Sequence, residues 1–268
     1  MDLADALGLG DRALVSFVGA GGKKTAARHL VADGAARARR VGYTTTTHTP
    51  PLDNLPLVLA DPERPPWGAH SVAPDGRHGA LAFARERVSD PARATRKVRG
   101  YGPETVDAVF ERGDFDWLLV KADGARRREF KAPGPDEPVV PSRSTDVVVV
   151  VSVRAVGRRL DAPTVHRPER VAALSGRSVG DSLTTADLAA VLAAEGGGLR
   201  GVPAGARVHL VVNKADTPAL TTRGRAVVDA VRERTDRYAT TLVTALDPDG
   251  DTDDERAANP DDEREKSV

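Results

Sequence analysis

The residues in this sequence best suited to chemistry form a glycine-rich stretch, Gly19-Ala20-Gly21-Gly22-Lys23-Lys24-Thr25. Glycines allow backbone N–H groups to turn toward an anion, a following helix adds partial positive charge, and a lysine can reach the phosphates. A hydroxyl at the start of that helix can bind Mg²⁺, which makes Thr25 a metal-ligand candidate. The stretch predicts a phosphate-binding loop held by Gly19, Gly21, Gly22, Lys23, Lys24 and Thr25. The alternative is an ordinary glycine-rich turn before an alanine-rich helix.

The spacing of this loop departs from the usual motif G-x-x-x-x-G-K-[ST], because the segment from Gly19 to Lys24 is one residue short. Lys23 and Lys24 are therefore both candidates for the phosphate lysine. A dinucleotide-binding fingerprint fits less well, since its third glycine would fall on Lys24 and the second expected strand ends in threonine rather than in an acid. We therefore expect a P-loop-like site.

A second candidate follows the apolar residues 118–120, where Lys121-Ala122-Asp123-Gly124 ends an expected strand. In phosphate-loop proteins an acid at this position holds Mg²⁺, directly or through a water molecule. Asp123 is thus expected to bind the metal and to act with Lys23 and Lys24 in any catalysis. An Asp-Gly turn without a function is the alternative.

A third candidate is Asn213-Lys214-Ala215-Asp216, which follows the apolar residues 208–212 and has the N-K-x-D form of the guanine-reading loop of GTPases. A carboxylate accepts from guanine N1–H and the 2-amino group together, whereas adenine has an acceptor at N1 and no 2-amino group. We expect Asp216 to read guanine, Lys214 to lay its stem along the base, and Asn213 to tie this loop to the phosphate loop. Thr244-Ala245 is where a supporting base-contact loop would lie.

Two further stretches carry polar groups that have both a functional and a structural explanation. A hydroxyl from residues 44–47, such as that of Thr45 or Thr46, could bind Mg²⁺ and sense a γ-phosphate, although a β-rich spacer explains the stretch nearly as well. Arg126 begins the run Arg126-Arg127-Arg128, which could clamp an anionic substrate or be a solvated charge run. Both stretches remain open between a functional and a structural interpretation.

Short apolar runs alternate with helix-like stretches along the chain, a pattern typical of an α/β domain. The expected strands cover residues 13–18, 41–44, 55–60, 77–84, 115–121, 145–153, 208–212 and 239–244. The expected helices cover residues 25–38, 103–112, 184–194 and 221–234. Residues 145–153 are apolar on both faces, as a parallel strand covered by helices would be. We therefore expect a single domain, residues 1–246, with a P-loop-like, mostly parallel sheet flanked by helices.

The composition sets limits on the chemistry. The 268-residue chain is 40% hydrophobic and 29% charged, which is enough to bury a core. With 0 Cys, thiol nucleophiles, disulfides and cysteine metal sites are excluded. The formal net charge of +0 conceals a basic body and an acidic tail, residues 247–268, which we expect to be disordered. No signal peptide or membrane span is evident, so we expect a soluble cytoplasmic protein.

The segment LVKADGARRREFKAPGPDEPVVP, residues 119–141, resembles the YqeC family. The pieces VGAGGKKT, the threonine run, VHRPE and VVNKAD follow in family order, so the resemblance covers roughly residues 12–246. Its central motif, A-D-G with basic residues, then K-A-P and E-P-V-x-P, is specific, since no general nucleotide-binding fold requires it. The resemblance implies that Lys131, Glu137 and His166 are site residues of unknown role.

The resemblance also implies a function, which is that of an accessory protein of selenium-dependent molybdenum hydroxylases involved in selenium cofactor biosynthesis. This sequence departs from the family at Lys121, where glutamate is usual, and at Lys24, where threonine is more common. The first departure argues against a second acidic ligand at that position. Without cysteine, the protein cannot carry selenium on a cysteine sulfur, so it would act on another protein or cofactor.

These features together predict a Mg²⁺-dependent GTP-binding protein, with ATP as the other possible nucleotide and NTPase activity left open. Its expected partners are the nucleotide and a molybdenum hydroxylase or its cofactor-assembly proteins. One alternative is a non-hydrolysing binding module for a phosphate-bearing cofactor. Another is a small-molecule kinase or nucleotidyltransferase in which residues 126–128 hold an anionic acceptor. A nucleic-acid partner is disfavoured, because 4% aromatic residues offer few stacking platforms.

Overall fold

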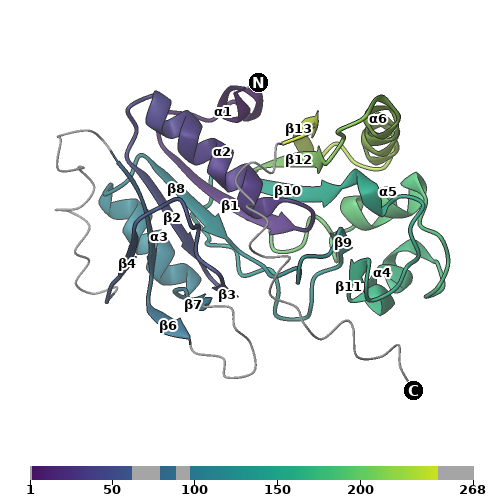
Figure 1. The fold of residues 1–268 in the computed structure, drawn as a ribbon, viewed down its shortest axis with the longest axis horizontal. Helices are drawn as coiled ribbons and strands as arrows, with labels where there is room; N and C mark the ends of the chain where they lie inside the picture. Colours follow the sequence, from purple (N-terminus) through teal and green to yellow (C-terminus); the bar gives the residue numbers. More distant parts are fainter. Residues whose placement is uncertain (1, 62–78, 89–96, 247–268) are drawn as a thin grey trace, which may run out of the picture.

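The computed structural model describes residues 2–61, 79–88 and 97–246, and strands and helices alternate along them (Figure 1). The helices are α1 (Leu3–Leu7), α2 (Lys23–Ala36), α3 (Pro103–Arg112), α4 (Pro168–Ser175), α5 (Thr185–Ala193) and α6 (Pro218–Arg232), with a short 3-10 helix, η2 (Val153–Ala155). The strands are β1 (Ala13–Gly19), β2 (Val41–Thr45), β3 (His48–Thr49), β4 (Leu57–Leu59), β5 (Ala80–Ala84), β6 (Glu86–Val88), β7 (Lys97–Arg99), β8 (Trp117–Lys121), β9 (Phe130–Lys131), β10 (Asp146–Ser152), β11 (Val165–His166), β12 (Arg207–Asn213) and β13 (Tyr238–Val243). The predicted acidic tail, residues 247–268, lies outside the described residues.

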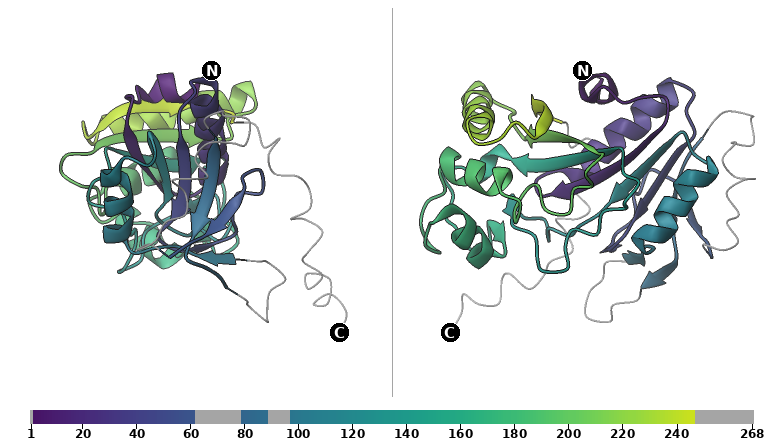
Figure 2. Two further views of the ribbon diagram at one scale, coloured as in Figure 1. Left: turned by 90° about the vertical axis from the view of Figure 1, so that its left-hand side faces the viewer. Right: turned by 180° about the vertical axis from the view of Figure 1, so that it is seen from behind.

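One 8-stranded sheet dominates the fold, with the strand order β13-β12-β10-β1-β8-β2-β5-β4. Every neighbouring pair in it runs parallel. Helices α4, α5 and α6 gather at the end of the molecule that holds β10 to β13, and α3 lies toward the other end (Figure 1); the view from behind shows the same arrangement (Figure 2). This confirms the predicted single-domain α/β fold with a parallel sheet flanked by helices.

The valines of β10 show why this strand sits in the middle of the molecule. Val147, Val149 and Val151 belong to the core cluster that also takes in the buried side chains of α5 and α6. Val148 and Val150 belong to the cluster beneath α1 and α2 on the other face. An apolar run buried on both faces is what a parallel strand covered by helices requires. The prediction for this strand is therefore confirmed.

The strand order brings the predicted functional loops to one edge of the sheet. Strand β8 lies between β1 and β2, so the order differs from the dinucleotide-binding arrangement, in which the second strand lies beside the first. Phe17 of β1 pairs in register with Lys121 of β8, and Gly19 pairs with Val150 of β10. The glycine loop and Asp123 therefore leave the sheet side by side, at the edge where open parallel sheets bind ligands.

The ends of several helices follow local capping rules. Helix α5 begins with the predicted capping box between Thr184 and Asp187. Helix α6 begins earlier than predicted, at Pro218, because proline fits the first turn and the Thr217 side chain caps the N–H of Leu220. Helix α2 also begins earlier than predicted, at Lys23. None of the helices in the described ranges is long and apolar enough to cross a bilayer.

Two small sheets flank the main one and were not predicted. Strands β9 and β11 pair in parallel, and β3, β7 and β6 form an antiparallel sheet. Strands of two or three residues are too short to carry a periodic hydrophobic signal. The β9–β11 pair matters for the site, because its register places Lys131 beside His166.

Candidate functional site

The glycine loop between β1 and α2 is fixed by close packing against neighbouring strands. Gly19, Gly21 and Gly22 have φ angles of 92°, 85° and 133°, which L side chains rarely adopt. A Cβ atom on Gly21 would lie 2.4 Å from the backbone nitrogen of Ser152, and one on Gly22 would lie 2.4 Å from Asn213 Nδ2. The N–H groups of Gly21 and Gly22 have no acceptor among the described residues. These free donors precede the first turn of α2, where an anion is favoured.

Lys23 forms a buried ion pair with Asp123 beside this loop. Its Nζ lies 2.8 Å from Asp123 Oδ1 and also donates to the carbonyl of Gly19. The N–H of Gly19 donates to Asp123 Oδ2 at 2.8 Å. Lys23 is 5% exposed and Asp123 is 1% exposed, whereas Lys24 is only partly buried. Of the two candidate lysines, Lys23 is therefore the one at the centre of the site.

A second lysine, Lys131, holds the other oxygen of Asp123. Lys131 Nζ lies 2.9 Å from Asp123 Oδ2 and 2.9 Å from Glu137 Oε2, and it donates to the carbonyl of Gly124 at 2.7 Å. Arg167 Nη1 lies 2.7 Å from Glu137 Oε2. Lys131 and Glu137, which the resemblance singled out, thus belong to the network around Asp123. Arg167 belongs to it as well, although sequence reasoning did not select it.

The lysines of this network outnumber its carboxylates. Burial alone would raise the pKa of Asp123, but the charges of Lys23 and Lys131 hold it below its usual range. Lys121 is 9% exposed, and burial together with the charge of Lys23 lowers its pKa to about 7. Among the described residues, the carboxylates near Lys121 and Lys24 form their ion pairs with Lys23 and Lys131 instead. In the sequence, Lys121 stands out as a single lysine at the end of an otherwise apolar strand.

The donor atoms at this site do not match the magnesium ligands that the sequence predicts. In the motif G-K-[ST] the hydroxyl residue directly follows the phosphate lysine, and here that position is Lys24, because Gly22-Lys23 occupies G-K. Thr25 stands one residue further along α2. Both carboxylate oxygens of Asp123 already contact lysine ammonium groups. While Lys23 and Lys131 hold these oxygens, neither is open to Mg²⁺, which binds through oxygen ligands in octahedral geometry.

The threonines after β2 use their hydroxyls to hold backbone. Thr45 Oγ1 donates to the carbonyl of Lys121, and Thr46 Oγ1 donates to the carbonyl of Val139, each at 2.7 Å. These bonds fasten the end of β2 to β8 and to the segment before β10. The arrangement favours the spacer interpretation of residues 44–47.

The loop after β12 contacts the glycine loop, as predicted. Asn213 Nδ2 donates to the carbonyl of Gly21 at 3.2 Å. Asn213 Oδ1 accepts from Thr244 Oγ1 at 3.1 Å and from the N–H of Leu246 at 2.9 Å. The buried amide thereby joins three loops at the same edge of the sheet, including the predicted supporting loop at Thr244.

The other two residues of the N-K-x-D segment have charged partners. Lys214 Nζ lies 2.9 Å from Glu129 Oε1. Asp216 Oδ2 lies 2.6 Å from Arg154 Nη2, and these two side chains are 46% and 47% exposed. An exposed ion pair of this kind is worth only about 0–1 kcal/mol, so a ligand can replace Arg154 at little cost. Sequence reasoning missed Arg154 and Glu129 because both are distant from the loop in sequence.

His166 pairs in register with Lys131, and the charge of Arg126 acts on its imidazole. Burial, with the charges of Arg167, Lys131 and Arg126, lowers the pKa of His166 to about 4, so its imidazole is neutral at pH 7. Arg126 is exposed and has a positive φ of 47°. Arg126, Lys131 and His166 therefore face one region, where a neutral imidazole adjoins several cations.

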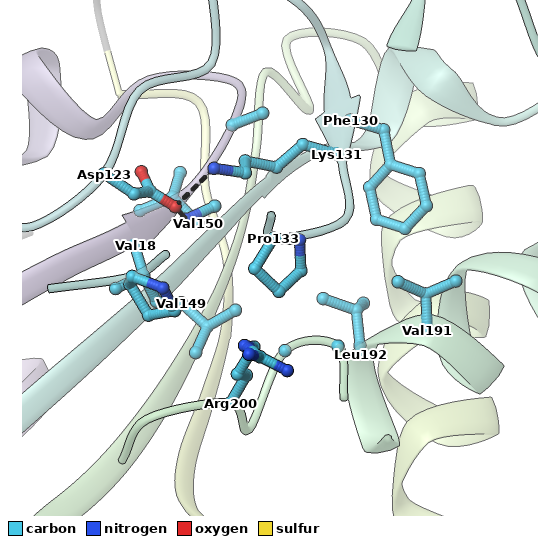
Figure 3. A pocket seen from close by; sticks show the side chains of 15 residues that line it. Val18, Asp123, Phe130, Lys131, Pro133, Val149, Val150, Val191, Leu192 and Arg200 are labelled. Atoms are coloured by element: carbon cyan, nitrogen blue, oxygen red, sulfur yellow. Dashed lines mark hydrogen bonds and ion pairs between the residues drawn. The ribbon is translucent and has the colours of Figure 1, made fainter. Parts of the chain in front are cut away.

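A pocket opens from the glycine loop toward α5 (Figure 3). Asp123 and Lys131 form its charged side, Phe130 lies beside Lys131, and Val191 and Leu192 supply further apolar side chains (Figure 3). Arg200, which also lines the pocket, donates to the carbonyls of Glu137 and Pro135 at 3.0 and 2.7 Å. The pocket thus places an apolar surface directly beside the charged network.

Together these features define an α/β protein in which a parallel strand leads through a glycine loop into a helix. A buried aspartate after β8, the neighbouring strand in the sheet, pairs with the lysine that begins this helix. The model of the YqeC protein family matches residues 15–169. A relative is the uncharacterized protein YqeC of Escherichia coli (strain K12), which is 32% identical over 204 residues, 75% of each chain. The chain belongs to the YqeC family. The matched range includes the glycine loop, Asp123 and His166, and it ends before Asn213.

Proposed function

We propose that this protein binds GTP at the carboxyl edge of its sheet and serves as an accessory factor in the maturation of a selenium- or molybdenum-dependent hydroxylase. The geometry of the loops supports the nucleotide part, and the resemblance to the YqeC family supports the maturation part. The phosphates would lie over the free N–H groups of Gly21 and Gly22, with Lys23 turning from Asp123 to reach them. Asp216 would accept hydrogen bonds from guanine.

The observation that carries this proposal is the hydrogen bond from Asn213 Nδ2 to the carbonyl of Gly21. It joins a loop suited to reading a base with a loop suited to holding phosphates, across 192 residues of sequence. A nucleotide bridging the two loops would place its base near Asp216 and its phosphates near Lys23. The parallel sheet alone brings both loops to the same edge, so the support lies in the side-chain hydrogen bond that joins them directly.

The nucleotide preference can be measured by calorimetric titration of the purified protein with GTP and with ATP. We expect GTP to bind and ATP to bind at least about tenfold more weakly, because the Asp216 carboxylate gains charged hydrogen bonds only from guanine. Equal affinities would make the loop at residues 213–216 structural and favour a kinase or nucleotidyltransferase. Absence of binding by either nucleotide would refute the nucleotide part.

The maturation role is tested in a host that makes such a hydroxylase. Cells lacking this protein should produce the hydroxylase polypeptide at its normal level but with reduced activity and reduced selenium or molybdenum content. The wild-type protein should restore both, and a Lys23→Met variant, which loses the central lysine, should restore neither. A fully active hydroxylase in the deleted strain would refute the maturation part.

The pocket beside Lys131 favours a second candidate, a non-hydrolysing binding module for a phosphate-bearing cofactor. Its apolar lining, with Phe130 and Leu192, suits an organic group attached to a phosphate held by the glycine loop (Figure 3). Phosphate release separates the two candidates. A binding module would retain its ligand intact, whereas a GTPase would release inorganic phosphate.

A further inference from the structure

Lys121 points toward the amino end of α2. Successive side chains of a strand alternate between the two faces of a sheet. Trp117 and Leu119, on the same strand, pack in the core cluster beneath α1 and α2. Lys121, two residues after Leu119, therefore lies on the α2 face, where the first turn of that helix carries Lys23 and Lys24.

Positive charges outnumber the carboxylates at this point, where Glu137 pairs with Lys131 and Arg167. Lys23, Lys24 and Lys131 all lie close enough for their charges to act on Lys121, and Asp123 is the carboxylate that opposes them. Asp123 is already paired with Lys23 and Lys131. The nearby carboxylates are thus taken up by other lysines, so an anion that contacts Lys121 would supply the opposite charge that the site lacks. An anionic ligand would complete the cluster.

The positions of the two free lysines indicate what they replace. Lys24 stands where the phosphate-loop motif has its metal-binding hydroxyl, directly after the central lysine. Lys121 lies two residues before Asp123, at the end of the neighbouring strand. An ammonium group offers no oxygen to a metal ion, but it donates charged hydrogen bonds directly to phosphate oxygens.

We propose that Lys24 and Lys121 supply the positive charge that Mg²⁺ supplies in other phosphate loops, so that this site binds a nucleotide di- or triphosphate without a divalent metal. This inference rests on the proposed phosphate binding at the glycine loop, and it adds how the charge of the phosphates is neutralised. The ligand class is a polyphosphate whose oxygens contact the first turn of α2 and the end of β8.

The test is a calorimetric titration with GTP and with inorganic pyrophosphate, each in buffer containing EDTA and in buffer containing MgCl₂. The affinity in EDTA should equal or exceed the affinity in MgCl₂, because direct lysine contacts favour the metal-free anion. Binding that requires Mg²⁺, or a Kd that falls about tenfold when Mg²⁺ is added, would overturn the inference. Either result would leave the proposed function intact. Absence of binding in both buffers would refute both this inference and the proposed nucleotide binding.

Two variants separate the roles of the free lysines. Lys121→Met keeps the aliphatic stem and removes an ammonium group that lies among other lysines, so it should not lower the Tm of the ligand-free protein. The same change should weaken pyrophosphate binding in EDTA at least about tenfold, the usual worth of a hydrogen bond to a charged group. Lys24→Thr restores the hydroxyl position, so it should weaken binding in EDTA and make it stronger in MgCl₂ than in EDTA.

The matched control is Arg225→Ala, which removes an exposed cation from α6 and should change neither Tm nor affinity. Lower Tm for Lys121→Met combined with unchanged pyrophosphate affinity would show that Lys121 is a structural residue and would overturn the inference. Unchanged affinity in both lysine variants would overturn it as well, whatever their stability.

Discussion

Replacing Lys23 with methionine is expected to weaken the binding of GTP and of pyrophosphate by about a hundredfold or more. Lys23 begins α2, and its ammonium group lies beside the loop whose N–H groups are free. The variant loses the charged hydrogen bonds from Lys23 to phosphate. It also leaves Lys131 as the lysine that pairs with the Asp123 carboxylate. The site would then attract an anion more weakly, with Lys24, Lys121 and Lys131 as its remaining lysines. Calorimetric titration measures the loss.

Folding has to be separated from binding in this variant. Methionine retains the aliphatic stem of Lys23, and Asp123 keeps Lys131 and the N–H of Gly19 as partners. We therefore expect a cooperative thermal transition and an unchanged far-UV circular dichroism spectrum. Arg225→Ala on α6 is the control for loss of one positive charge. Wild-type affinity in a folded Lys23→Met protein would contradict the assignment of the phosphate site.

Asp216→Asn is expected to weaken GTP binding by about a hundredfold, because the amide cannot accept two hydrogen bonds from guanine as the carboxylate does. The same variant should gain affinity for xanthosine triphosphate, since the new amide donates to the xanthine 2-carbonyl. ATP affinity should stay low in both proteins. Competition titrations with the three nucleotides measure the change.

Arg154→Ala is the matched variant for this prediction, because it breaks the same ion pair from the other side. If Asp216 reads guanine, freeing its carboxylate should keep or raise GTP affinity, while Asp216→Asn lowers it. A structural ion pair would make the two variants behave alike. Equal losses in both, or no change in Asp216→Asn, would assign the loop a structural role.

The main sheet could be predicted from the sequence because its central strands are buried on both faces. The predicted strands at residues 145–153 and 208–212 match β10 and β12 to within one residue at each end for that reason, and the capping box at Thr184 marks the start of α5. The short strands β9 and β11 could not be predicted, since they depend on a pairing between Lys131 and His166 rather than on a local pattern. The position of Lys131 beside His166 is therefore known only from the three-dimensional structure.

The site itself was predictable where a motif fixes local geometry. The order of the glycine loop, Asp123 and Asn213 along successive strands predicts that they meet, and the Asn213–Gly21 hydrogen bond confirms that contact. The choice between Lys23 and Lys24 depends on where α2 begins, and local propensity placed that start at Thr25 rather than at Lys23. The pairing of Arg154 with Asp216 arises from tertiary packing, which no local signal encodes.

The most direct test of nucleotide binding at this edge of the sheet is a crystal structure of the protein with a non-hydrolysable GTP analogue. We expect the phosphates over the N–H groups of Gly21 and Gly22, with Lys23 Nζ bonded to a phosphate oxygen and the guanine edge on Asp216. An analogue bound elsewhere, with Lys23 still paired to Asp123 and the glycine loop without a ligand, would contradict the account.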